Sequence, residues 1–220
     1  MTEPTERIRI IEQTKLIVIV RGLAREVLLP FAEAVYAGGI RAMEITYDAS
    51  GKTPDAEIAD RIRMLKTYFG ERMLIGAGTV LNERQVLLTA DAGGDLIISP
   101  HTDPAVIAAT KSKGMLSIPG AFTPTEMVRA HQCGADFVKL FPVTALSPAY
   151  IKAVRAPLPQ IRLLAVGGVS LENGKAYLAA GVSGFGLGAN IVDQNAILRG
   201  DYPAITACAK AYCDLVGGTV

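Results

Sequence analysis

MLSIPGAFTPTEMVRAHQCGADFVKLF, residues 115–141, contains the signals of a complete strand–helix–strand unit. The stretch begins and ends with short apolar runs, at 115–119 and 137–141, which have the length of buried strands. Between them, Thr123 takes the N-cap position, a proline follows it, and Glu126 completes a capping box. Gly134 then follows the helical segment, as is typical of a helix end. This stretch therefore predicts two parallel strands joined by a helix.

The same unit recurs along the whole chain. Eight apolar runs alternate with helix-length segments, at residues 16–21, 42–47, 73–79, 96–99, 115–119, 137–141, 162–166 and 184–187. An open, doubly wound sheet uses the same local signals, but the count of eight favours a (β/α)8 TIM barrel. No linker divides the chain, so we expect one barrel domain over residues 1–220. An extra N-terminal helix at 6–13 should lie at the bottom of the barrel.

Composition excludes several classes of protein. Hydrophobic residues make up 50% and charged residues 20% of the chain, which excludes intrinsic disorder. The net charge of +1 argues against a nucleic-acid partner. The polar N-terminus does not resemble a signal peptide, and no apolar run approaches the ~20 residues of a membrane span. Three cysteines without paired spacing fit a reducing compartment. We therefore expect a cytoplasmic protein with no membrane partner.

Lys139 lies inside the apolar run at 137–141. Burial disfavours an ammonium group and lowers its pKa, and a neutral amine is a nucleophile toward ketones. The alternative is a lysine whose stem packs while its head reaches water. The position favours the first interpretation, in which Lys139 forms a Schiff base.

Glu44 lies in the run at 42–47. The two-residue period of a strand puts Glu44 and Thr46 on one face and the apolar neighbours on the other. If the apolar face meets the helices, Glu44 points into the barrel, where it could relay protons for imine chemistry. The alternative is a structural ion pair with Lys139 or Arg21.

Other strand ends carry groups suited to anions. Arg21 ends the first run, and the Thr79 hydroxyl ends the third. Glycine-rich turns follow the last two runs, at 167–168 and 188–189, where barrels commonly bind phosphate. Metal ligands are scarce: of the two histidines only His101 follows a strand, where it could touch a ligand. We therefore expect no metal site.

Motifs at six strand ends occur in the order found in one enzyme family. They are Glu44-Ile45-Thr46, Gly76-Ala77-Gly78-Thr79-Val80, Ile98-Ser99-Pro100, Ile118-Pro119-Gly120, Val138-Lys139-Leu140-Phe141-Pro142 and Gly167-Gly168-Val169. With these motifs, nearly the whole chain resembles the 2-keto-3-deoxy-6-phosphogluconate (KDPG) and 4-hydroxy-2-oxoglutarate (KHG) aldolases. The resemblance implies a homotrimeric class I aldolase that needs no cofactor. It would cleave a phosphorylated 2-keto-3-deoxy sugar acid to pyruvate and glyceraldehyde 3-phosphate, or 4-hydroxy-2-oxoglutarate to pyruvate and glyoxylate.

The resemblance also implies roles for individual residues. Lys139 corresponds to the Schiff-base lysine and Glu44 to the general acid/base. Thr79 would bind the pyruvyl carboxylate. The remaining members of the expected site shape the pocket or line its phosphate end: Pro100, Phe141, Gly167, Gly168, Gly188 and Ala189.

Three departures bear on the substrate. Gluconate-type members use an arginine where Asp48 stands, so Arg21 is expected to take the anion-binding role. The stretch at 165–168 resembles the 6-phosphogalactonate aldolases, because Val166 replaces a hydroxyl residue. Ala189 stands at a position where both types of aldolase often have a serine. The C4 stereochemistry of the sugar therefore stays open.

Two other readings remain. A sugar-phosphate epimerase or decarboxylase would share the glycine-rich turns, but such enzymes usually carry metal ligands or a second aspartate near the lysine. A non-catalytic sugar-phosphate-binding protein would need no buried Glu44–Lys139 pair, so a large separation of these two residues would favour it.

Overall fold

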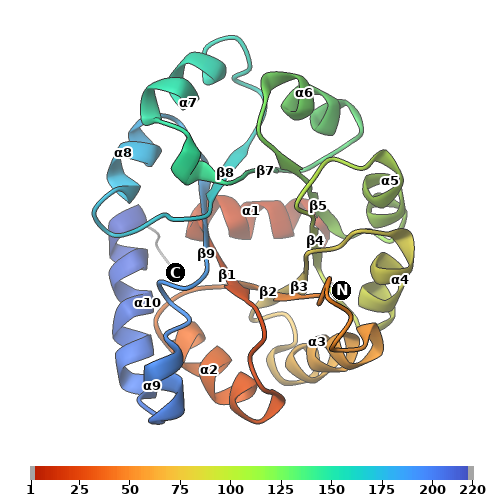
Figure 1. Cartoon of the computed structure of the whole chain (residues 1–220), viewed down its shortest axis with the longest axis vertical. Helices are drawn as coiled ribbons and strands as arrows, with labels where there is room; N and C mark the ends of the chain where they lie inside the picture. The colour runs from red at the N-terminus through yellow and green to blue at the C-terminus, as the bar shows by residue number, and fades with distance from the viewer. Residues whose placement is uncertain (1–2, 218–220) are drawn as a thin grey trace.

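The computed structural model describes residues 3–217 and shows a ring of parallel strands surrounded by helices (Figure 1). The strands are β1 (Leu16–Val20), β2 (Ala42–Thr46), β3 (Leu74–Gly78), β4 (Leu96–Ile98), β5 (Leu116–Ile118), β6 (Gly120–Ala121), β7 (Val138–Leu140), β8 (Leu163–Val166) and β9 (Gly184–Leu187). Their order in the sheet is β5-β4-β3-β2-β1-β9-β8-β7-β6. Sequential strands are therefore neighbours almost throughout.

The ring closes through a strand that Pro119 divides. β5 pairs with β4 on one side, and β6 pairs with β7 on the other. The Lys139 N–H donates to Pro119 O at 2.9 Å, which joins the ends of the sheet. β5 and β6 are thus two halves of one barrel strand. The prediction of an eight-stranded barrel is confirmed, and the open-sheet alternative is wrong.

The helices form the outer layer, and α6 (Pro124–Gln132) begins at its predicted capping residue. Thr123 and Glu126 form the expected capping box, and Gly134 has the positive φ of +96° that a helix end favours. The elements of this layer are α2 (Arg25–Ala37), α3 (Asp55–Phe69), α4 (Glu83–Asp91), α5 (Pro104–Ser112), α6 (Pro124–Gln132), the short 3-10 helix η1 (Val143–Ala145), α7 (Pro148–Arg155), α8 (Gly174–Ala179), α9 (Gln194–Leu198) and α10 (Tyr202–Val216).

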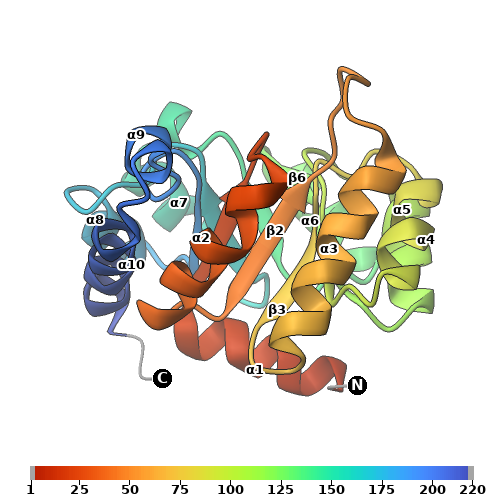
Figure 2. The same ribbon diagram turned by 90° about the horizontal axis from the view of Figure 1, so that it is seen from below.

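The extra helix α1 (Pro4–Thr14) crosses one end of the barrel, as Figure 2 shows along its lower edge. It begins two residues before the predicted start and ends one residue after the predicted end. Its Ile11 is fully buried among barrel-interior side chains that include Leu74, Leu116 and Phe137. Since β1 follows α1 directly, α1 covers the amino-terminal ends of the strands. The opposite end is left for a site.

Two hydrophobic cores reflect the alternation of side chains along each strand. In β2, Met43 and Ile45 belong to the core between the barrel and the helices, whereas Ala42 belongs to the core inside the barrel. Glu44 and Thr46 share the face of Ala42, so the prediction that they point inward is confirmed. In the part of the chain that the structure describes, every helix is too short or too polar to cross a membrane.

Candidate active site

A cavity of about 480 Å³ opens at the carboxyl ends of the strands. Nine of the ten predicted site residues line it, each from a strand or the turn after it: Arg21, Thr79, Pro100, Lys139, Phe141, Gly167, Gly168, Gly188 and Ala189. The tenth, Glu44, lies inside the barrel on β2. Residues that are distant in sequence are thus brought to one end of the barrel, where parallel strands present their catalytic groups.

Lys139 is the central residue of β7 and is 6% exposed. Its Nζ lies 4.7 Å from the centre of the Phe141 ring, a cation–π distance. Burial lowers the pKa of Lys139, the negative charge of Glu44 opposes this effect, and Arg21 adds to it. The lysine head is therefore held in the cavity rather than in bulk water, and a larger share of its amine is neutral than in an exposed lysine.

Glu44 is 1% exposed, and burial raises its pKa to about 7 although Lys139 and Arg21 act to lower it. Its Oε2 is buried and has no hydrogen-bond partner among the described residues. Within residues 3–217 no salt bridge joins Glu44 to Lys139 or Arg21, although the charges of both act on its carboxyl group. A carboxyl with a pKa near 7 can both accept and donate a proton at physiological pH.

Arg21 and Thr79 meet at the rim of the cavity. Arg21 Nη2 donates to Thr79 Oγ1 over 3.2 Å. Thr79 has a φ of +56°, a left-handed conformation that is unusual for a β-branched residue. Such strain is common at ligand sites, where the surrounding structure enforces it. The pair presents a guanidinium and a hydroxyl toward the same cavity.

The glycine turns after β8 and β9 form another part of the cavity wall. Gly167 and Gly168 have φ values of +91° and +89°, so both adopt a backbone that side chains disfavour. A β-carbon at Gly168 would also lie 2.0 Å from Thr144 Cγ2. Gly188 follows β9 and has open space where a side chain would be. Bare backbone on this wall leaves N–H groups accessible to an anion.

Sequence reasoning missed some residues of the cavity wall. Asn190 lines the cavity and donates from Nδ2 to Val169 O at 2.5 Å, which ties together the turns after β8 and β9. An asparagine beyond a glycine turn carries no sequence signal for this role. His101, by contrast, is not among the lining residues; its half-exposed ring lies 4.0 Å from Asp103. The described residues contain no cluster of His, Cys, Asp or Glu that could hold a metal ion.

Comparisons with known proteins agree with this geometry. Residues 8–208 match the family model "KDPG and KHG aldolase". The chain is 42% identical over 204 residues to a probable 2-dehydro-3-deoxy-6-phosphogalactonate aldolase of Rhizobium meliloti, covering 92% of this chain and 93% of that protein. It is 37% identical to the 2-dehydro-3-deoxy-6-phosphogalactonate aldolase of Escherichia coli, covering 93% and 98%.

A solved structure of Legionella pneumophila KDPG aldolase, with pyruvate captured as a covalent carbinolamine, is also similar. The two chains superpose with a TM-score of 0.83 and 29% identity, over 96% of this chain and 98% of that one.

Proposed function

The chain belongs to the KDPG and KHG aldolase family, and from this premise we propose that it is a single-domain class I aldolase. It cleaves 2-keto-3-deoxy-6-phospho sugar acids to pyruvate and glyceraldehyde 3-phosphate. The observation that carries the proposal is the buried pair of Lys139 and Glu44, whose pKa values move toward each other at the end of the barrel that holds the cavity. A binding protein would have no need of such a pair.

Imine formation begins at Lys139. The lowered pKa leaves more of the amine neutral, and the nitrogen attacks the C2 ketone to give a carbinolamine. Glu44 supplies the proton with which the C2 hydroxyl leaves as water, and a protonated imine remains. Its pKa of about 7 makes Glu44 suited to both directions of proton transfer.

Carbon–carbon cleavage uses the same two residues. Glu44, now ionised, takes the proton of the C4 hydroxyl, and the C4 oxygen forms the aldehyde carbonyl as the C3–C4 bond breaks. The electron pair of that bond moves through C2 to the imine nitrogen, which leaves the pyruvate enamine on Lys139. Protonation of C3 and addition of water then release pyruvate and regenerate the amine.

The cavity walls orient the two ends of the substrate. Arg21 and Thr79 bind the keto-acid carboxylate, because a guanidinium and a hydroxyl side by side match its oxygens. The glycine turns at 167–168 and 188–189 bind the phosphate through backbone N–H groups. Pro100 and Phe141 contribute apolar wall to the part of the cavity between the substrate's carboxylate and its phosphate.

Galactonate-type or shorter substrates are favoured in this proposal. Val166 and Ala189 bring no hydroxyl to the phosphate end, and an aspartate stands at position 48. The named relatives of Rhizobium meliloti and Escherichia coli are phosphogalactonate aldolases, which supports the same preference. 4-Hydroxy-2-oxoglutarate, which yields pyruvate and glyoxylate, is included as a second substrate.

Assembly and compartment belong to the same proposal. We expect a homotrimer in the cytoplasm, supported by the family resemblance and by the unpaired state of Cys133, Cys208 and Cys213. Sedimentation equilibrium should give about three times the 23.2 kDa chain mass. A monomer would contradict the proposed homotrimer but would not bear on the proposed reaction.

Borohydride trapping tests the chemistry directly. Wild-type protein incubated with pyruvate and borohydride should gain a stable adduct that mass mapping assigns to Lys139. Lys139→Ala should lose both the adduct and turnover, while Glu44→Gln should keep some adduct and lose ~10²–10⁴-fold in rate. An adduct on another lysine, or full activity of Lys139→Ala, would refute the assignment. Circular dichroism controls for unfolding.

A further inference from the structure

Three successive carbonyl groups in the turn after β8 are each held by a protein donor. Gly167 O accepts from Thr144 N at 3.2 Å, Gly168 O from Asn173 Nδ2 at 2.9 Å, and Val169 O from Asn190 Nδ2 at 2.5 Å. The C=O and N–H of a planar trans peptide point in opposite directions, so these bonds also set the directions of the Gly168 and Val169 N–H groups. Neither N–H has an acceptor among the described residues.

The turn after β9 is fixed in the same way. Gly188 O accepts from Ile191 N and from Val192 N, both at 3.0 Å, which sets the direction of the Ala189 N–H. That N–H also lacks an acceptor in the described part of the chain. Both turns line the cavity that holds Lys139. Consecutive N–H groups in a turn can converge on one anion, so the two turns together offer N–H groups of fixed direction to a phosphate.

Asn190 is the side chain that joins the two turns. It follows Ala189 directly, lines the cavity, and reaches Val169 O in the turn after β8. Its own position is set from α10: its backbone oxygen accepts from Cys208 Sγ at 3.4 Å, and a hydrogen bond links its side chain to the hydroxyl of the buried Tyr212. The amide of Asn190 therefore determines how far the turn after β8 lies from the turn after β9.

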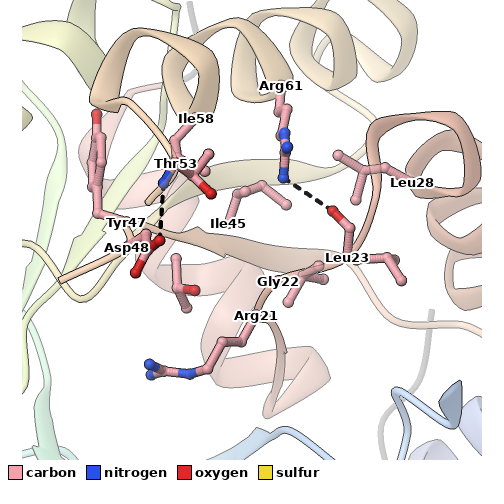
Figure 3. A pocket seen from close by; sticks show the side chains of 12 residues that line it. Arg21, Gly22, Leu23, Leu28, Ile45, Tyr47, Asp48, Thr53, Ile58 and Arg61 are labelled. Atoms are coloured by element: carbon pink, nitrogen blue, oxygen red, sulfur yellow. Dashed lines mark hydrogen bonds between the residues drawn. The ribbon is translucent and has the colours of Figure 1, made fainter. Parts of the chain in front are cut away.

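The smaller cavity in Figure 3, of about 190 Å³, is poorly suited to a phosphate. The dashed lines there join its polar groups to one another: Arg61 Nη1 donates to Leu23 O, and Thr53 N donates to Asp48 Oδ2. Hydrogen bonds from Ser50 and Thr53 lower the pKa of Asp48 to about 2, so its negative charge is present throughout the physiological range. Like charges repel, which favours the glycine turns as the site for the phosphate.

We propose that Asn190 is a positioning residue for the phosphate of the substrate. Its side-chain amide holds the two glycine turns at the separation at which N–H groups from both reach one phosphate group. The proposal rests on the aldolase function proposed above and deepens it, because it names a residue that decides how tightly the phosphorylated end is bound. Asn190 acts through the backbone of the turns, so it should affect binding of the phosphate and not the chemistry at Lys139.

The test measures KM and kcat for a 2-keto-3-deoxy-6-phospho sugar acid in Asn190→Ala. Its matched control is Asn195→Ala, an exposed asparagine on α9 outside the cavity. Asn190→Ala should raise KM about tenfold, as the loss of a hydrogen bond worth ~1.4 kcal/mol implies, and change kcat by less than about twofold. Asn190→Gln keeps an amide donor at this exposed position and should recover part of the KM. Asn195→Ala should match the wild type.

Two further readouts separate positioning of the phosphate from a general structural role. Glycerol 3-phosphate carries the phosphate but no keto acid, and its binding, followed by phosphorus NMR, should weaken about tenfold in Asn190→Ala. Pyruvate carries the keto acid but no phosphate, and its borohydride trapping on Lys139 should stay within about twofold of the wild type.

A wild-type KM in Asn190→Ala, or equal losses in pyruvate trapping and glycerol 3-phosphate binding, would overturn the proposal. Failure of the proposed function looks different. In that case the wild type traps no pyruvate and cleaves no phosphorylated acid, whatever happens to glycerol 3-phosphate binding in Asn190→Ala.

Discussion

The carboxyl group of Glu44 occupies the space in which a side chain at position 78 would lie. A β-carbon built on Gly78 would come within 2.4 Å of Glu44 Oε1 and 2.5 Å of its Cδ. The φ of Gly78 is not positive, so space rather than backbone conformation requires glycine here. The end of β3 thus accommodates the carboxylate that the proposed mechanism uses.

Gly78→Ala should therefore displace the Glu44 carboxyl and lower kcat by roughly 10²-fold, at the lower end of acid/base contributions. The measurement is steady-state pyruvate release, with borohydride trapping to show that Lys139 still forms an adduct. Adding Glu44→Asp to Gly78→Ala shortens the carboxylate and should recover part of the loss. Wild-type kcat in Gly78→Ala would show that the contact does not position Glu44.

Glu44 should also make the protein less stable as the pH rises. Burial raises its pKa from 4.5 to about 7, so between these pH values the folded chain retains a proton that the unfolded chain has released. The free energy of unfolding falls with pH across that window, by about 3 kcal/mol as an order of magnitude. Glu44→Gln lacks this proton and should gain stability relative to wild type from pH 4.5 to 7.

Urea unfolding of both proteins at several pH values measures this difference. Lys139 has a lowered pKa, which has the opposite effect toward higher pH. Because Glu44→Gln also removes the charge that raises the pKa of Lys139, the two proteins are compared only between pH 4.5 and 7. A stability difference that does not change between pH 4.5 and 7 would show that Glu44 titrates normally.

The residues that line the cavity could be predicted from the sequence, because a barrel brings the carboxyl ends of all its strands to one end. Period-two alternation was sufficient to point Glu44 inward, and capping residues marked the helix starts. The division of the fifth strand at Pro119 was not foreseen, because apolar pattern does not show which backbone groups pair. The bond from Asn190 to Val169 was also not foreseen, since it depends on how the turn after β9 lies against the turn after β8.

Substrate choice should follow the small apolar side chains at the phosphate end. With Val166 and Ala189 in place of hydroxyl residues, activity on galactonate-type or shorter 4-hydroxy-2-oxo acids should rival or exceed activity on the gluconate epimer. Steady-state kcat/KM for the two C4 epimers decides this. Ala189→Ser, which restores one hydroxyl, should improve the KM for phosphorylated substrates by about 2- to 10-fold, the worth of one hydrogen bond. A strong preference of the wild type for the gluconate epimer would refute the interpretation of Val166.

Gln85 connects the turn after β3 with the start of α3 and the end of β2. It is 6% exposed, and its Oε1 accepts from Leu81 N at 2.8 Å, two residues beyond the strained Thr79. Its Nε2 donates to Asp55 Oδ1 at 3.2 Å, at the start of α3. Its backbone oxygen accepts from the buried Tyr47 hydroxyl at 3.1 Å, at the end of β2. One buried side chain thus helps to hold the turn that keeps Thr79 in its left-handed conformation.

Gln85→Met keeps the length of the side chain but leaves the Leu81 N–H without its acceptor. We expect the turn after β3 to relax, the Thr79 hydroxyl to leave Arg21, and the KM for the keto acid to rise about tenfold, as the loss of ~1.4 kcal/mol of binding implies. The kcat should change much less, because Lys139 and Glu44 are untouched. Gln85→Glu retains the acceptor for Leu81 but turns a carboxylate toward Asp55, so its KM should lie between those of Gln85→Met and the wild type. If Gln85→Met lowers thermal stability but leaves KM unchanged, Gln85 supports the fold alone and does not position Thr79.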